Sequence, residues 1–286
     1  MTLHFSDDVE AYAAAVDGFL DAAPASRNLL RGLIDTARQG ALTWTAAPGF
    51  WWIDAADQVV GCATWTPPYP MAVSTLPDRA AAELLRSARD RAQQIGVALP
   101  GVNGPRPAAE AVAAAWTDAT GHGTTLQMAE LLHEAGVLVE PARPPGAMRT
   151  AGAADVDVCL EWTLAFVVES GVMSGDQSRM RAVVEHTLSG GRCHLWDVDG
   201  EPVSMVAHQP HAPVVRIGPV YTPPQHRTRG YARRLTYEVT RRLLDTPGVD
   251  RASLYTDVAN PVSNSIYRQI GYLPIEEHSV LLFDGA

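Results

Sequence analysis

The sequence has no lysine, only three cysteines and no long hydrophobic run. All 22 residues counted as Lys or Arg are therefore arginine. Fixed positive charge at a ligand site must then be a guanidinium, which suits bidentate contacts with phosphate. The cysteines, Cys62, Cys159 and Cys193, lack the spacing of a metal site, so we interpret them as buried free thiols. No apolar run approaches the length that crosses a bilayer, which excludes a membrane partner.

Charge and composition narrow the class of protein further. A net charge of −10 disfavours nucleic acid as a partner, and 47% hydrophobic residues support a packed core rather than disorder. The first residues, Met1 to Asp8, lack the basic and apolar parts of a signal segment, so we expect a cytoplasmic protein. A length of 286 residues suits two domains, and the oligomeric state stays open.

A proline-rich segment divides the chain. Residues 140–146 hold three prolines and a glycine, which do not belong within a helix or a central strand. We predict a first domain at 1–140, a linker at 141–147 and a second domain at 148–286. Both halves contain an apolar strand that ends in an acidic hairpin turn, at Trp52–Asp57 and Leu195–Gly200.

The predicted elements follow the same order in both halves, which indicates degenerate copies of one α/β unit. An unrelated α/β domain is the alternative for the first half. In that half we expect helices at 8–22, 26–38, 78–95 and 105–119, and strands at 50–54, 59–66, 71–75, 97–99 and 125–132. In the second half we expect helices at 155–170, 176–189, 230–245 and 261–270, and strands at 192–197, 202–208, 214–221, 251–256 and 277–283.

The most informative stretch is Arg227–Ala232, with the pattern R-x-x-G-x-A. It follows a β-branched run and opens an amphipathic one, so it predicts a strand, a glycine turn and a helix. The first N–H groups of a helix have no partner within it and lie at the positive end of its dipole, which favours a diphosphate. Gly230 lets the backbone approach the anion, and nearby arginines (Arg227, Arg229, Arg233 and Arg234) add positive charge.

A second motif follows further along the chain. Residues Asn260–Tyr267 have the pattern N-x-x-S-N-x-I-Y, and Gly271-Tyr272 comes after them. The two motifs in this order resemble the GNAT superfamily of acyl-CoA-dependent N-acyltransferases. The resemblance implies an α/β (α+β) chain with tandem GNAT-like, mixed and mostly antiparallel sheets flanked by helices.

The resemblance also implies acetyl-CoA as cosubstrate, no metal, and transfer of an acetyl group to a primary amine by direct attack. In such a fold, the strand before the first motif splays from its neighbour at a bulge. The main chain of Val220, Tyr221 and Thr222 would contact the pantetheine arm in that gap. The diphosphate would lie on six consecutive residues, Arg227, Thr228, Arg229, Gly230, Tyr231 and Ala232.

The second motif supplies the remaining residues. The resemblance assigns Asn260 and Asn264 to the cofactor, although Asn260 before Pro261 equally predicts a helix N-cap. It assigns Tyr267 to protonation of the leaving thiolate, with a core tyrosine as the alternative. The general base is open among Glu161, Glu169, His186, His194, His208 and Asp257; Glu169 is our candidate, and a water relay is the alternative.

The first half lacks this chemistry. Its corresponding turn, Ser74–Ala80, has no glycine and carries Asp78, which would cap the next helix and repel phosphate. We therefore expect the first half to brace the second and to wall its substrate cleft. The acceptor is expected to be a small-molecule amine or a protein N-terminus. A non-catalytic CoA-binding or CoA-sensing protein and a transferase of longer acyl chains are the alternatives.

Overall fold

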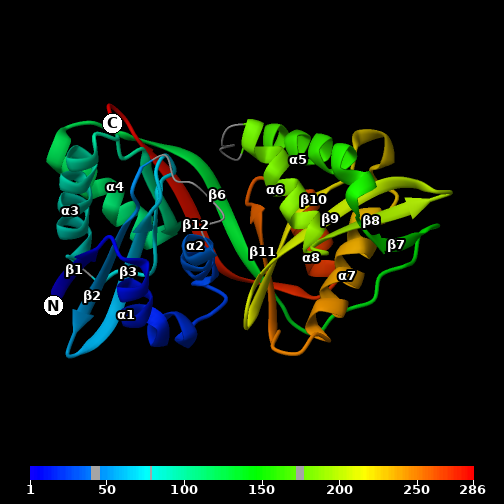
Figure 1. Ribbon diagram of the computed structural model, residues 1–286, viewed down its shortest axis with the longest axis horizontal. Coiled ribbons are helices and arrows are strands. Elements are labelled where there is room, and N and C mark those ends of the chain that lie inside the picture. Colours follow the sequence, from blue (N-terminus) through cyan, green and yellow to red (C-terminus); the bar gives the residue numbers. More distant parts are fainter. Residues whose placement is uncertain (40–45, 78, 172–176) are drawn as a thin grey trace. The chain divides into compact units, whose positions relative to one another are not determined.

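A computed structural model describes residues 1–39, 46–77, 79–171 and 177–286 (Figure 1). The chain forms two compact units. Unit 1 holds Met1–Leu131 and Glu276–Ala286, and unit 2 holds Leu132–Ile275. The limits differ from the predicted 1–140 and 148–286, because the chain changes unit before the proline-rich segment and its last residues belong to unit 1.

Unit 1 is a sheet with helices on both faces. Its strands lie in the order β1 (Thr2–Ser6), β2 (Gly49–Ala55), β3 (Gln58–Trp65), β4 (Met71–Val73), β5 (Gly101–Pro105) and the end of β12 (Tyr272–Phe283). Only the β4–β5 pair among these is parallel. Two buried clusters cover the faces: one involves α1 (Val9–Ala22) and α2 (Asn28–Gln39), the other α3 (Ala80–Ile95) and α4 (Arg106–Thr120).

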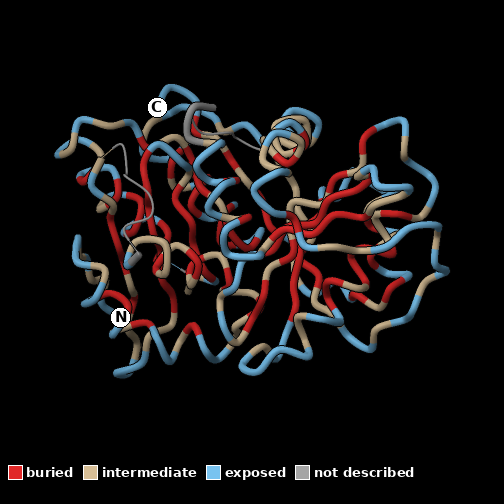
Figure 2. Tube along the Cα trace, turned by 45° about the vertical axis from the view of Figure 1, so that its right-hand side comes forward, coloured by how far each residue is buried: buried red, intermediate tan, exposed pale blue. Residues whose placement is uncertain are grey.

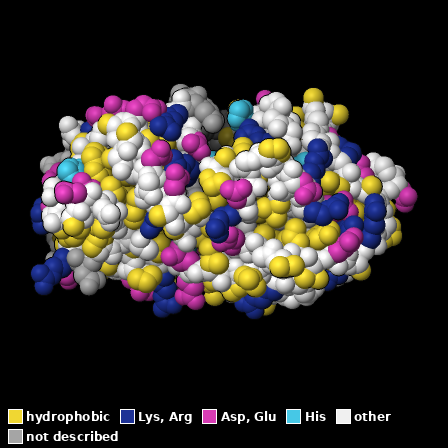
Figure 3. All heavy atoms as spheres, turned by 90° about the horizontal axis from the view of Figure 1, so that it is seen from below, with side chains coloured by type: hydrophobic (Ala, Val, Ile, Leu, Met, Phe, Trp, Pro, Cys, Tyr) yellow, Lys and Arg dark blue, Asp and Glu magenta, His cyan; other side chains and the backbone are white. Residues whose placement is uncertain are grey.

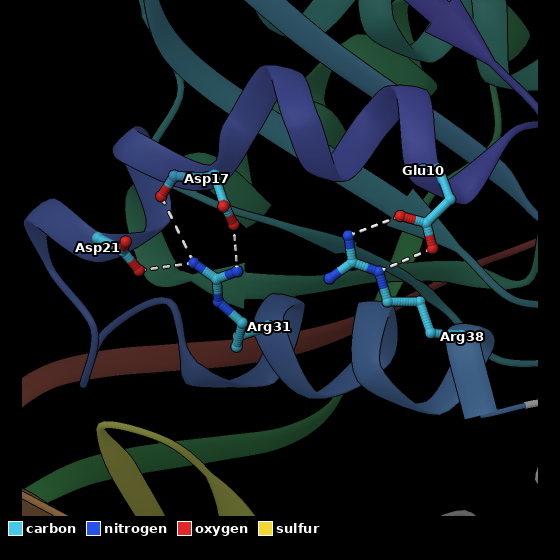
Figure 4. Close-up of polar contacts among 5 residues, drawn as sticks. All are labelled: Glu10, Asp17, Asp21, Arg31 and Arg38. Atoms are coloured by element: carbon cyan, nitrogen blue, oxygen red, sulfur yellow. Dashed lines mark hydrogen bonds and ion pairs between the residues drawn. The ribbon is translucent and has the colours of Figure 1, made fainter. Parts of the chain in front are cut away.

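Helices α1 and α2 run antiparallel, and ion pairs connect them at their surface. Figure 4 shows Arg31 of α2 between Asp17 and Asp21 of α1, with 2.6 Å from its Nη2 to Asp21 Oδ1. At the other end, Arg38 contacts Glu10 at 2.8 Å. Such exposed pairs contribute little free energy, so the buried apolar cluster between the helices and the sheet provides most of the stability.

Unit 2 repeats this arrangement. Its strands lie in the order β7 (Ala147–Thr150), β8 (Cys193–Val198), β9 (Glu201–His211), β10 (Val214–Tyr221), β11 (Arg251–Asp257) and the end of β6 (Thr124–Ala135). Strands β7 to β10 are antiparallel, and β10 pairs with β11 in parallel. Helices α5 (Val156–Ser170) and α6 (Gln177–Ser189) cover one face, and α7 (Tyr231–Leu244) and α8 (Pro261–Gln269) cover the other.

The two units share local geometry as well as strand order. The β2–β3 turn has positive φ at Ala56 and Asp57 (49° and 60°), and the β8–β9 turn has it at Asp199 and Gly200 (53° and 87°). A two-residue turn with positive φ at both positions matches the right-handed twist of a hairpin. The predicted α/β (α+β) fold, with a repeated and mostly antiparallel sheet, is confirmed.

The exchange of the last strands explains why the predicted domain limits differ. The sixth strand of unit 1 is the end of β12, and β6 reaches unit 2 from Leu132 onward. Strand β12 pairs with β5 from His278 to Leu282. Hydrophobic alternation predicts that a strand exists but not the sheet edge that it joins, so a linear boundary could not describe these units.

One predicted strand was misplaced. The sequence predicted a strand at 97–99, whereas β5 begins at Gly101. The glycines of β5 allow close backbone approach: a Cβ on Gly104 would lie 2.5 Å from the carbonyl oxygen of Val73. The edge strands β1 and β7 were not predicted, and Asp78 lies outside the described residues.

Burial follows the strands and the inner faces of the helices (Figure 2). The cysteines are free and buried, as predicted. No helix within the described ranges is long and apolar enough to span a membrane. On the face drawn in Figure 3, arginines lie beside acidic side chains, so the negative net charge does not form one acidic patch there.

Candidate functional site

Strand β10 separates from β11 halfway along its length. The parallel pairs between them run from Val214 to Arg216, opposite residues 251–253, although both strands continue beyond. On its other side, β10 shifts register against β9 between Ile217 and Val220. This is the bulge and splay implied by the resemblance, and it leaves a gap in the sheet beside the last residues of β10.

The turn after β10 leads directly into α7. Gly230 stands at the N-cap with φ of 83°, and no side chain of the described residues caps the helix. Thr228, two residues earlier, also adopts a positive φ of 63°. The first N–H groups of α7 are therefore not capped by a side chain, and the left-handed turn suits the glycine at its end.

A cavity of about 840 Å³ lies in unit 2 between these elements. It brings together residues from the end of α5, the end of β10, the turn, the start of α7 and α8. The predicted site residues that line it are Glu169, Val220, Tyr221, Thr222, Arg227, Thr228, Gly230, Tyr231, Ala232, Asn260 and Tyr267. Two predicted residues, Arg229 and Asn264, are not among the residues that line it.

Glu169 reaches the cavity from the last turn of α5 and is already engaged there. Its Oε1 accepts a hydrogen bond of 2.8 Å from the Tyr221 hydroxyl, and its Oε2 lies 2.6 Å from Arg227 Nη2. Partial burial raises the pKa of Glu169, but the bonds from Tyr221 and Arg227 outweigh it, so the pKa lies below its usual value. The carboxylate is thus ionised at neutral pH and a weak base while these contacts last.

Tyr267 lines the cavity from α8. Its side chain is buried and packs edge-to-face on Tyr272 at 6.1 Å between ring centroids. Burial raises the pKa of Tyr267 well above its usual value, with no hydrogen bond among the described residues to offset it. The phenol therefore keeps its proton firmly, which favours donation of a hydrogen bond over complete proton transfer.

The two asparagines of the second motif have structural roles. Asn260 caps α8, because its Oδ1 accepts from the backbone N–H of Ser263 at 3.0 Å. Asn264 is buried, and its Nδ2 donates to the carbonyl oxygens of Asp257 and Asn260 at 3.0 and 2.8 Å. Its Oδ1 accepts from Thr256 at 2.5 Å. Asn264 therefore fastens α8 to the end of β11.

Two adjacent arginines of α7 differ in environment. Arg233 lines the cavity. Arg234, expected beside it, is buried and pairs with Glu238 at 2.7 Å and Glu140 at 2.8 Å, and it also donates to the Pro141 carbonyl at 3.0 Å. Neighbouring residues on a helix point in different directions, so Arg234 anchors the proline-rich segment instead of surrounding the site.

Several lining residues were not predicted. Phe166 and Ser170 come from the last turns of α5, and His226 directly precedes Arg227. The Nδ1 of His226 is buried without a hydrogen-bond partner among the described residues. Its position next to the R-x-x-G-x-A pattern could have indicated that His226 lies at the site. Of the six groups considered as general base, Glu169 alone lines the cavity.

Comparisons with known proteins agree with this geometry. Residues 198–281 match the family model described as FR47-like protein. The structure of a GCN5-related N-acetyltransferase from Sphaerobacter thermophilus aligns with a TM-score of 0.62 and 18% identity, covering 99% of this chain and 95% of that one. An acetyltransferase of the GNAT family from Colwellia psychrerythraea gives 0.61 and 10%, covering 99% of both.

A tandem GNAT protein from the clavulanic acid biosynthesis pathway aligns with a TM-score of 0.53 and 13% identity, covering 99% of this chain and 98% of that one. No curated protein matches the sequence. At these identities the likeness establishes the fold. The chain has a tandem GNAT fold, which confirms the resemblance inferred from the two motifs.

Proposed function

We propose that the chain transfers an acetyl group from acetyl-CoA to a primary amine by direct attack on the thioester. The observation that carries the proposal is one cavity that joins the open side of β10, the uncapped start of α7 and the Tyr267 ring. The acceptor in this proposal is a small-molecule amine or a protein N-terminus.

The residues present fit acetyl-CoA. The start of α7 offers backbone N–H groups at the positive end of the helix dipole, and Arg227 and Arg233 line the same cavity. Gly230 presents no Cβ to a ligand that lies against the turn. The main chain of Val220 to Thr222, beyond the last pair with β11, can accept an extended pantetheine arm as a strand would.

The chain's own residues then act on the reaction in separate ways. Attack by the neutral amine forms a C–N bond at the acyl carbon and breaks the C–S bond of acetyl-CoA; the amine proton passes to ordered water, and the sulfur leaves as a thiolate. Backbone N–H groups of β10 stabilise charge on the attacked carbonyl oxygen, and Tyr267 donates a hydrogen bond to the departing sulfur. Positioning of the amine beside the thioester supplies a further part of the rate.

Two measurements test this function. Calorimetric titration of the purified chain with acetyl-CoA is expected to show micromolar binding. A panel of primary amines is then expected to release free thiol, measured with a chromogenic disulfide. Binding without thiol release from any amine would favour a non-catalytic CoA-binding protein. Release that is faster with a longer acyl-CoA would favour the other alternative, and absence of binding would contradict the proposal.

A further inference from the structure

Glu169 forms an ion pair with Arg227 inside the cavity. It links α5 to Arg227, which also donates from Nε to the Thr222 carbonyl oxygen at 2.9 Å and lies with its guanidinium 5.8 Å from the centre of the Tyr221 ring. Among the described residues that line the cavity, Glu169 is the one carboxylate. The arginine at the start of the phosphate-binding pattern is therefore already paired with an anion.

The contacts that Arg227 already makes compete with a diphosphate for the same guanidinium. A guanidinium binds phosphate through parallel N–H donors, and two donors of Arg227, Nε and Nη2, are held by Thr222 and Glu169. An ionised carboxylate within the same cavity also repels a second anion. Both effects oppose binding of the diphosphate while Glu169 keeps its contact.

The Arg227–Glu169 ion pair is exposed enough for Arg227 to exchange Glu169 for another anion. The side chains of Arg227 and Glu169 are 43% and 44% exposed, so breaking their contact costs little. We propose that Glu169 is an internal counter-ion of Arg227 which the diphosphate of the cofactor displaces, so that Glu169 sets cofactor affinity. The inference rests on the proposed function, because it requires a diphosphate ligand in this cavity.

The test uses CoA, which binds without acyl transfer, and isothermal titration of the full chain. Glu169→Gln removes the charge and keeps the shape, and we expect about two- to fivefold tighter binding. Glu161→Gln on the same helix is the matched control, because Glu161 is exposed and does not line the cavity. We expect its affinity to equal that of the wild type.

Measuring the same change in a variant without Arg227 distinguishes release of Arg227 from a general effect of removing a negative charge. In Arg227→Gln, the further change Glu169→Gln is expected to alter CoA affinity by less than about twofold. Glu169→Asp, whose shorter side chain cannot keep both contacts, provides a second variant and should also bind more tightly. Circular dichroism checks that each variant is folded.

The outcomes distinguish the two proposals. If the wild type binds CoA and Glu169→Gln binds equally or more weakly, the counter-ion inference is wrong and the proposed function stands. An equal gain with and without Arg227 would also overturn it. If the wild type does not bind CoA, the proposed function itself fails.

Discussion

Gly230 and Gly248 stand on either side of α7 with nearly the same left-handed backbone, at φ of 83° and 84°, but only Gly230 of the two lines the cavity. A side chain at either position meets the same conformational strain. The pair therefore allows the effect of strain to be separated from the effect of a side chain and charge at the anion site.

We expect Gly230→Asp to abolish CoA binding, because it places a negative side chain at the uncapped start of α7. Gly248→Asp introduces the same strain at an exposed position with no atom within 4 Å of the new Cβ. It should lose about 1 kcal/mol of stability, as Gly230→Asp does, but keep its affinity for CoA. Titration calorimetry and urea unfolding of both variants measure this. Equal CoA affinity in the two variants would refute the anion site.

Much of the site was predictable because its residues are close in sequence. Arg227–Ala232 and Asn260–Tyr267 are continuous segments in which a local pattern fixes a turn, a helix start and the helix face. Gly230 at the N-cap and Asn260 as the cap of α8 follow from local rules alone. The general order of helices and strands was predictable for the same reason.

Other features depend on contacts between distant segments. Glu169 lies 58 residues before Arg227, so no local pattern indicates that the two are paired. The orientation of Asn264 is set by a carbonyl oxygen at the end of β11, and Arg234 faces Glu140 rather than the cavity. The strand predicted at 97–99 was misplaced, because β5 contains glycines whose role is close approach to neighbouring strands. These contacts join residues that are distant in sequence, so only the tertiary structure shows them.

Tyr267→Phe tests the hydrogen bond to the leaving sulfur. Because the hydroxyl has no partner among the described residues, its removal should leave stability nearly unchanged. We expect kcat for acetyl transfer to fall by about 10²-fold, with little change in the affinity for CoA. Steady-state thiol release and calorimetry give the two quantities.

Tyr272→Phe is the control for this change. Tyr272 packs against Tyr267, and its hydroxyl lies 2.7 Å from that of Thr240 in the core. Its removal should cost about 1 kcal/mol of stability but leave kcat unaltered. Unchanged turnover in Tyr267→Phe across the full pH range would remove Tyr267 from the reaction.

Arg234→Ala and Arg233→Ala should have opposite consequences. The Arg234 side chain is 7% exposed and pairs with Glu238, which is 13% exposed, so its loss leaves a largely buried carboxylate unpaired. We expect a loss of about 3 kcal/mol in the free energy of unfolding, with CoA affinity retained. Arg233→Ala should weaken CoA binding and cost less stability. Urea unfolding and calorimetry distinguish them, and a reversed pattern would mean that Arg234 faces the ligand.

The histidines His194 and His208 are stacked in the core of unit 2, with ring centroids 5.6 Å apart. Burial lowers the pKa of each to about 4; the charge of His208 and that of Arg242 add to the effect on His194, and those of Arg192 and Arg242 to the effect on His208. Both rings are therefore neutral in the folded chain at pH values where an unfolded chain begins to bind protons.

The unfolded state binds these protons at a higher pH than the folded state. The free energy of unfolding therefore has its full value above about pH 6.5 and decreases as the pH drops toward 4. Each histidine should account for about 3 kcal/mol of the loss. In His208→Leu we expect a shallower decline between pH 7 and 4.5, measured by urea unfolding. His186→Gln, which changes an exposed histidine of α6, should keep the wild-type slope. Parallel curves for the wild type and His208→Leu would show that carboxylates, and not this buried pair, cause the acid sensitivity.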